Sequence, residues 1–107
     1  MPDNSVPSLT LKGRTYTLDP GKLGPADDRL CRTLTDPDRF GVLQLMQALI
    51  SEPALDRLAV VLFFARRQAG EPNLTLEQAE EGLTYDDLFE ALQSIGKVEE
   101  VEDESGN

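Results

Sequence analysis

The hydrophobic pattern is strongest in the run LAVVLFFARRQAG, from Leu58 to Gly70, which is apolar on almost every side of a helix. A helix over residues 54–69 is predicted, because one face repeats apolar residues at spacings of three and four: Leu55, Leu58, Leu62, Ala65 and Ala69. Gly70 is a typical helix stop. At least this face of the helix should pack against the rest of the domain.

The opposite side of this helix carries a second apolar strip. Val60 and Phe64 lie four residues apart, with Phe63 at the edge, and the strip is bordered by the charged residues Asp56, Arg57 and Arg67. Such a strip is either a second buried face, packed under later helices, or an exposed docking patch for a partner. Val60, Phe63 and Phe64 are thus the candidate partner-binding residues.

Another helix is predicted over residues 37–50, with Asp36 as its N-cap and Pro37 at its first helical position. Its apolar side chains cover most of its circumference: Phe40, Val42, Leu43, Leu45, Met46, Leu49 and Ile50. Residues 26–34 are consistent with an additional short helix.

Two short acidic helices follow, each announced by a capping box. Thr75 with Gln78 predicts a helix over residues 76–81, and Thr84 with Asp87 predicts one over residues 85–95. In the second, the spacing places one set of side chains inward: Tyr85, Leu88, Phe89, Leu92 and Ile95. The polar side chains expected outward are Asp86, Asp87, Glu90 and Gln93. We expect the helix to end at Gly96 and residues 97–107 to form a disordered acidic tail.

The N-terminal part has a strand pattern instead. Residues 1–7 are expected to be a flexible lead-in, and the alternation of residues 8–18 predicts a β-hairpin with one apolar face. A turn at Gly13-Arg14 would set Leu11 opposite Tyr16, and we favour it over a Lys12-Gly13 turn. The prediction is a single, mostly α domain over residues 8–96, with about four helices and the hairpin packed on them.

No residue pattern indicates catalysis, a cofactor or a metal. The chain has no histidine, and its single cysteine, Cys31, has no histidine to act as its base. Paired acids such as Asp27-Asp28 point about 100° apart on a helix and rarely form a two-carboxylate site. No apolar run is long enough for a membrane span, and the first residues do not resemble a secretory leader. We expect a protein that is not an enzyme.

Charge divides the chain into two unequal parts. Residues 1–67 hold nine Lys/Arg and eight Asp/Glu, whereas residues 68–107 hold one Lys and twelve Asp/Glu. The basic residues form no stripe, so neither nucleic acid nor an anionic membrane is an expected partner. The acidic part either serves as solvated surface or selects a basic partner.

The order of these parts resembles the tail assembly chaperones of long-tailed bacteriophages. The resemblance rests on a hairpin of the type LxLxGRxYxL, a helix ending in FFARRQAG, and the segment PNLTLEQAEEGLTYDDLFEAL, and it covers residues 8–96. It implies binding of the tape-measure protein, a long helical chain, during assembly of the tail tube in the host cytoplasm. The major tail tube protein is a second candidate partner, and the chaperone is not expected in the finished virion.

The resemblance also implies a longer form made by ribosomal frameshifting near the end of the short one. Gly96-Lys97-Val98 is compatible with a slippery codon sequence at that place. No functional residue carries over from the family, whose motifs consist of apolar spacing and caps.

Two other functions remain open. An acidic adaptor or inhibitor would cover a basic surface of its partner, and its binding would weaken steeply with salt. A structural component of the tail or head-tail junction would form stable rings and be present in particles.

Overall fold

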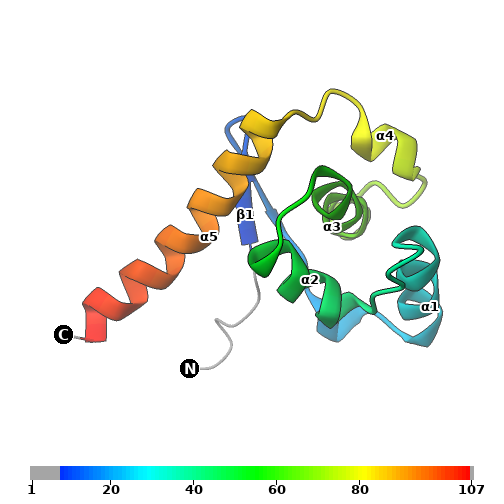
Figure 1. Cartoon of the computed structure of the whole chain (residues 1–107), viewed down its shortest axis with the longest axis horizontal. Coiled ribbons are helices and arrows are strands. Elements are labelled where there is room, and N and C mark those ends of the chain that lie inside the picture. Colours follow the sequence, from blue (N-terminus) through cyan, green and yellow to red (C-terminus); the bar gives the residue numbers. More distant parts are fainter. Residues whose placement is uncertain (1–7, 107) are drawn as a thin grey trace.

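The computed structural model describes the backbone of residues 8–106 and the side chains of residues 8–95. The described chain is mostly α-helical, with a two-stranded antiparallel hairpin packed on the helices, as predicted (Figure 1). The hairpin is β1 (Ser8–Leu11) and β2 (Arg14–Thr17), followed by a 3-10 turn, η2 (Pro20–Lys22). The helices are α1 (Pro25–Leu34), α2 (Val42–Ser51), α3 (Leu55–Gln68), α4 (Leu76–Glu80) and α5 (Tyr85–Gly106).

Helix α3 forms the centre of the domain, and both of its apolar faces are covered. Eight consecutive residues, 58–65, are buried, so every side of the helix is covered over this stretch. Figure 1 looks nearly along its axis, with the other elements arranged around it. Helices α2, α4 and α5 and strand β2 contact it directly. None of the described helices is both long and apolar enough to cross a membrane.

The hairpin register differs from the prediction. Leu11 pairs with Arg14 and Leu9 with Tyr16, around a Lys12-Gly13 turn in which both residues have positive φ. Such a turn matches the twist of the strands and usually carries Asn or Gly at its first position. Lys12 is held there by tertiary contacts, which residue spacing does not reveal. Its backbone N–H donates to Glu90 Oε1 (3.1 Å), and its Nζ donates to the carbonyl of Gly82 (3.0 Å).

Helix α2 also begins later than predicted. Asp36 and Pro37 lie in the connection after α1, and the first residue of α2 is Val42. The N–H of Val42 donates to Asp28 Oδ1 (2.9 Å), while Gln44 Oε1 accepts from the N–H of Gly41 (2.9 Å). A carboxylate of α1 therefore supplies the cap that the local sequence suggested for Asp36.

The orientation of α5 is a further correction. Leu88 and Ala91 are buried as the core face, but Tyr85 and Phe89, predicted inward, are exposed, and Asp87, predicted outward, is buried. The polar side of α5 lies on strand β1 and the hairpin turn, and it accepts hydrogen bonds from one N–H group of each. Ser94 Oγ accepts from Thr10 (2.8 Å), in addition to the bond between Lys12 and Glu90. The helical spacing predicts that Glu90 faces solvent, whereas in the structure it binds the open edge of the hairpin.

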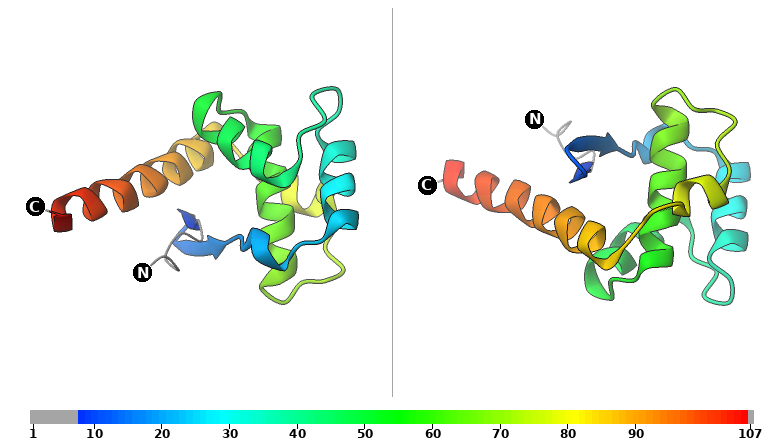
Figure 2. Two further views of the ribbon diagram at one scale, coloured as in Figure 1. Left: turned by 90° about the horizontal axis from the view of Figure 1, so that it is seen from below. Right: turned by 90° about the horizontal axis from the view of Figure 1, so that it is seen from above.

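The C-terminal helix is longer than predicted, because α5 continues past the expected end at Gly96 as far as Gly106. Both views of Figure 2 show this part of α5 projecting away from the other helices. The segment after Gly96 is rich in glutamate, a good helix former, and a helical glycine costs only about 1 kcal/mol relative to alanine. The predicted lead-in, residues 1–7, and Asn107 of the predicted tail lie outside the described residues.

Loss of the Asp28 charge should weaken the hydrogen bond that joins α1 to α2 only at pH values at which the carboxylate is ionised. The hydrogen bond from Val42, aided by the charge of Arg32, lowers the pKa of Asp28 below its ordinary value of 3.8. A depressed pKa in the folded state stabilises the fold fully above the unfolded pKa, and this contribution is lost as pH falls through the folded value. Asp28→Asn should therefore lower the urea midpoint at neutral pH, and the loss should disappear at an acidic pH below the folded pKa of Asp28.

Asp36→Asn is the matched control, because Asp36 is exposed and takes part in none of the ion pairs found among the described residues. Its substitution should leave the midpoint unchanged at both pH values. An equal loss of stability for Asp28→Asn at both pH values would contradict the assigned role of the charge.

Candidate docking groove

The residues predicted as partner anchors are part of the core. Val60, Phe63 and Phe64 are all buried in the main hydrophobic cluster. The rings of Phe63 and Phe64 meet edge to face, with centroids 5.0 Å apart, and the Arg67 guanidinium lies over Phe63 at 4.8 Å. Of the two interpretations of this strip, the structure shows the buried second face. These three side chains cannot contact a partner while the domain is folded.

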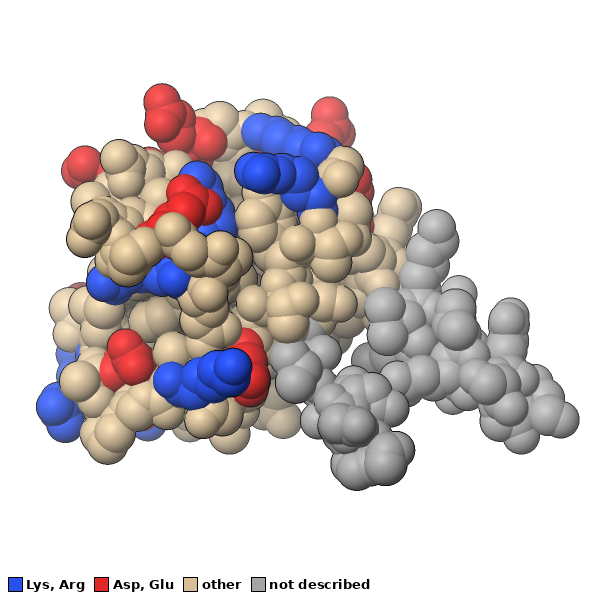
Figure 3. Space-filling model, turned by 180° about the vertical axis from the view of Figure 1, so that it is seen from behind, with Lys and Arg blue, Asp and Glu red and all other residues tan. Residues whose placement is uncertain are grey.

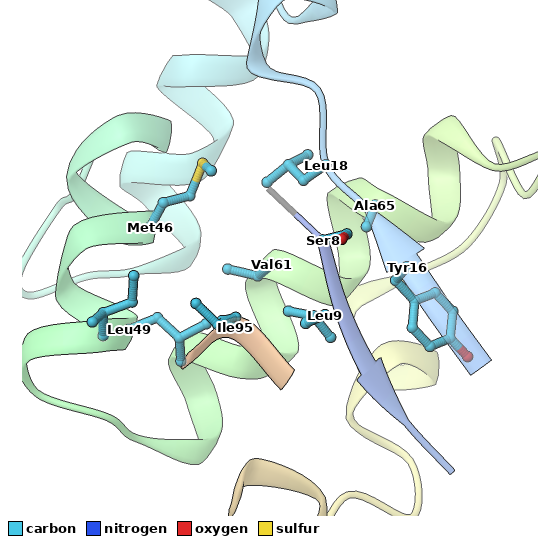
Figure 4. A pocket seen from close by; sticks show the side chains of 10 residues that line it. Ser8, Leu9, Tyr16, Leu18, Met46, Leu49, Val61, Ala65 and Ile95 are labelled. Atoms are coloured by element: carbon cyan, nitrogen blue, oxygen red, sulfur yellow. The ribbon is translucent and has the colours of Figure 1, made fainter. Parts of the chain in front are cut away.

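An apolar groove lies elsewhere, where α2, α3, α5 and the hairpin meet (Figure 4). Its walls come from five elements and are almost entirely hydrocarbon: Ser8, Leu9, Tyr16, Leu18, Met46, Leu49, Ile50, Val61, Ala65 and Ile95. We call this the α2–hairpin groove.

The groove has a buried floor and a more exposed rim. Val61 and Ala65 of α3 form the floor together with buried leucines from β1 and α2. Met46, Tyr16 and Ile95 are half-buried at the rim, and Ile50 is 53% exposed. In Figure 4 the Tyr16 hydroxyl points away from the other labelled side chains, so the ring contributes its apolar part to the groove. The groove therefore offers a partner apolar surface that α2 and the hairpin do not cover.

The size of the groove indicates what it can hold. Its volume is about 60 Å³, whereas sites for drug-sized molecules and cofactors enclose roughly 300–1,000 Å³. A space of this size, with no charged lining residue, suits one or two apolar side chains of a macromolecule. The geometry favours a protein ligand over a small one.

Chemical groups elsewhere in the described part of the chain do not form a reactive site. Cys31 is fully buried, and burial, together with the charge of Asp28, raises the pKa of its thiol to about 11. The thiol is thus neutral at physiological pH, which suits a packing role. Within residues 8–95, no group of three or more Cys, Asp or Glu side chains is placed to hold a metal ion.

Figure 3 shows how charge is distributed over one face of the molecule. On that face, Lys and Arg side chains lie among Asp and Glu. Opposite charges also form ion pairs in the described part of the chain, such as Arg66–Glu71 (2.9 Å). The two oxygens of Glu71 accept from Nε and Nη2 of Arg66, which lowers the pKa of Glu71. A charge mimic would need ordered rows of carboxylates, and the described residues of this face do not form them.

Residue spacing does not identify Met46 and Ile50 as part of a groove, although both lie on a helix that is apolar around most of its circumference. The apolar residues on α2 exceed what one buried face needs, and this excess indicates that some of them are exposed. A helix at the edge of a domain is covered on one side only, so some of its apolar side chains must remain exposed. On α2 these are Leu43 and Ile50.

No family model, curated protein or solved structure matches this chain.

Truncation of a predicted anchor should strongly destabilise the protein, whereas truncation at the groove rim should have little effect. Phe64→Ala removes a buried ring and should lower the free energy of unfolding by about 3–5 kcal/mol. Ile50→Ala, at a half-exposed position, should lower it by less than about 1 kcal/mol. Urea unfolding followed by circular dichroism measures both. Similar losses for the two variants would show that Ile50 belongs to the core and not to a binding surface.

Proposed function

We propose that this protein is a non-catalytic tail assembly chaperone of a long-tailed bacteriophage, which binds a helical segment of the tape-measure protein in the α2–hairpin groove. The observation that carries the proposal is the groove itself, an uncharged apolar site formed by five elements and sized for side chains. The resemblance of residues 8–96 to that family supplies the identity of the partner.

The groove chemistry supports this kind of client. A tape-measure chain is long and helical, and amphipathic helices bind grooves through apolar side chains spaced three and four residues apart. One such side chain would enter the space between Met46, Leu49 and Ile95, and its neighbours would cover Ile50. The apolar stripe of the client would then be shielded from other copies of itself, which is how a chaperone prevents aggregation.

The expected strength of this contact suits a client that is later released. Burial of one large apolar side chain contributes roughly 1.5–3 kcal/mol. Association itself costs at least about 4 kcal/mol, so two or three anchors give weak and reversible binding. Several chaperones along one client would hold it in solution and dissociate as the tube forms. In this proposal the protein acts in the host cytoplasm and is absent from the mature virion.

The proposal predicts that a charge in the groove abolishes the rescue of the client. Ile50→Asp should leave the tape-measure protein insoluble on co-expression, because the aspartate would be buried without a partner when the client binds. Leu43→Asp is the matched control. Leu43 lies on the same helix and is 66% exposed, but it lines a different hollow, beside η2. It should rescue as well as the unsubstituted protein.

The measurement is soluble recovery of the tape-measure protein, followed by pull-down at low and high salt. Recovery that changes little with salt and is lost only in Ile50→Asp would support the proposal. Equal effects of the two substitutions, or no rescue by the unsubstituted protein, would overturn it. Capture that is lost steeply as salt rises would favour an acidic adaptor, and stable rings retained in purified particles would favour a structural tail component.

A further inference from the structure

Three of the six aromatic side chains of this protein, those of Phe40, Phe63 and Phe64, are covered by other groups. Arg57 lies over the ring of Phe40 at 5.2 Å, and Arg67 lies over Phe63 at 4.8 Å. Phe64 is buried against Phe63. The fold thus uses an arginine twice to cover an aromatic face, an arrangement that is favourable both as a cation–π contact and as planar stacking.

Tyr85 and Phe89 are the exception. They are 60% and 56% exposed, although the other apolar side chains described on this helix, those of Leu88, Ala91, Leu92 and Ile95, pack in or against the core. Their ring centroids are 6.3 Å apart and the rings are tilted by 32°, so they form a side-by-side pair on the first turns of α5. Exposure of two adjacent large aromatic side chains is uncommon on a surface that binds nothing.

The charge next to this pair identifies the ligand it suits. Asp86 is exposed and lies three residues before Phe89, on the neighbouring part of the same helix face. Among the described side chains no cation pairs with it, whereas Asp87 is paired with Lys12 (3.5 Å). Asp86 and Asp87 lie in the first helical turn, and their charge offsets the positive end of the helix dipole, which would otherwise repel a cation. A cation at this place would therefore meet an unpaired carboxylate and two aromatic rings.

We propose that Tyr85, Phe89 and Asp86 form a docking surface for an arginine side chain of a partner protein, which we call the aromatic–acidic surface. The guanidinium stacks on the ring pair and donates to the Asp86 carboxylate. Arginine is favoured over lysine because its planar group can stack and donate at the same time. A phosphate-bearing ligand is excluded, because Asp86 would repel it. The surface lies outside the groove lining and does not depend on the proposed function.

The proposal is tested with a defined peptide probe and the full chain. The probe is a synthetic Ala/Gln-rich helix with two arginines four residues apart, and its matched control carries citrulline, which is isosteric but neutral, in place of each arginine. Addition of the arginine peptide to isotope-labelled protein should shift the backbone amide resonances of residues 84–90. The dissociation constant should be on the order of millimolar, because exposed cation–π and ion-pair contacts are weak. The citrulline peptide should bind several-fold more weakly.

Variants of the surface locate the site. Phe89→Ala should weaken binding of the arginine peptide about two- to fivefold, and Asp86→Asn by a similar factor. Leu43→Ala removes an equally exposed apolar side chain from α2 and should leave binding unchanged. If Phe89→Ala disturbs the fold, Tyr85→Leu and Phe89→Leu keep the apolar bulk while they remove the rings, and they should still weaken binding. Equal affinity for the citrulline peptide, or shifts centred on Met46 and Ile50, would overturn the proposal.

Discussion

Helix α3 is the part of the structure on which the rest depends, because a helix that is apolar on every side must be covered on every side. A partly exposed α3 would leave several large side chains in water, each at a cost of roughly 1.5–3 kcal/mol. Helices α2, α4 and α5 and strand β2 contact it, and the long-range order of the domain follows from this requirement. The groove is one place where this covering leaves an opening. There, Val61 and Ala65 of α3 form the floor of an opening between α2 and the hairpin.

Polar contacts fix the orientation of the elements that pack around α3. The carboxylate of Asp28 on α1 holds the first turn of α2, and Thr35 Oγ1 accepts from the N–H of Phe40 (2.7 Å) in the connection between them. On the other side of the domain, Glu90 and Ser94 bind the edge of β1. These bonds turn α5 about its axis, so that Tyr85 and Phe89 point away from the core. Thus the same bonds that fix the hairpin also create the aromatic–acidic surface.

Features set by neighbouring residues were predictable, whereas those set by distant contacts were not. The existence of the hairpin, the central helix and its stop at Gly70, and the Thr75–Gln78 and Thr84–Asp87 capping boxes all follow from local chemistry and are confirmed. The hairpin register, the start of α2 and the orientation of α5 depend on Lys12, Asp28 and Glu90. Each binds a group at least fourteen residues away, and that pairing leaves no mark on residue spacing.

The candidate sites also depend on distant contacts, because these contacts determine which apolar side chains are exposed. The sequences of α2 and α3 are both apolar around most of a helix, yet α3 is buried throughout its central part while α2 leaves Leu43 and Ile50 exposed. Composition alone therefore cannot separate a core strip from a docking surface, so the sequence allows both interpretations for Val60, Phe63 and Phe64, which are buried. The distinction depends on how many neighbours an element has. A central helix buries its apolar side chains in the core, whereas a peripheral helix of the same composition leaves some of them exposed for a partner.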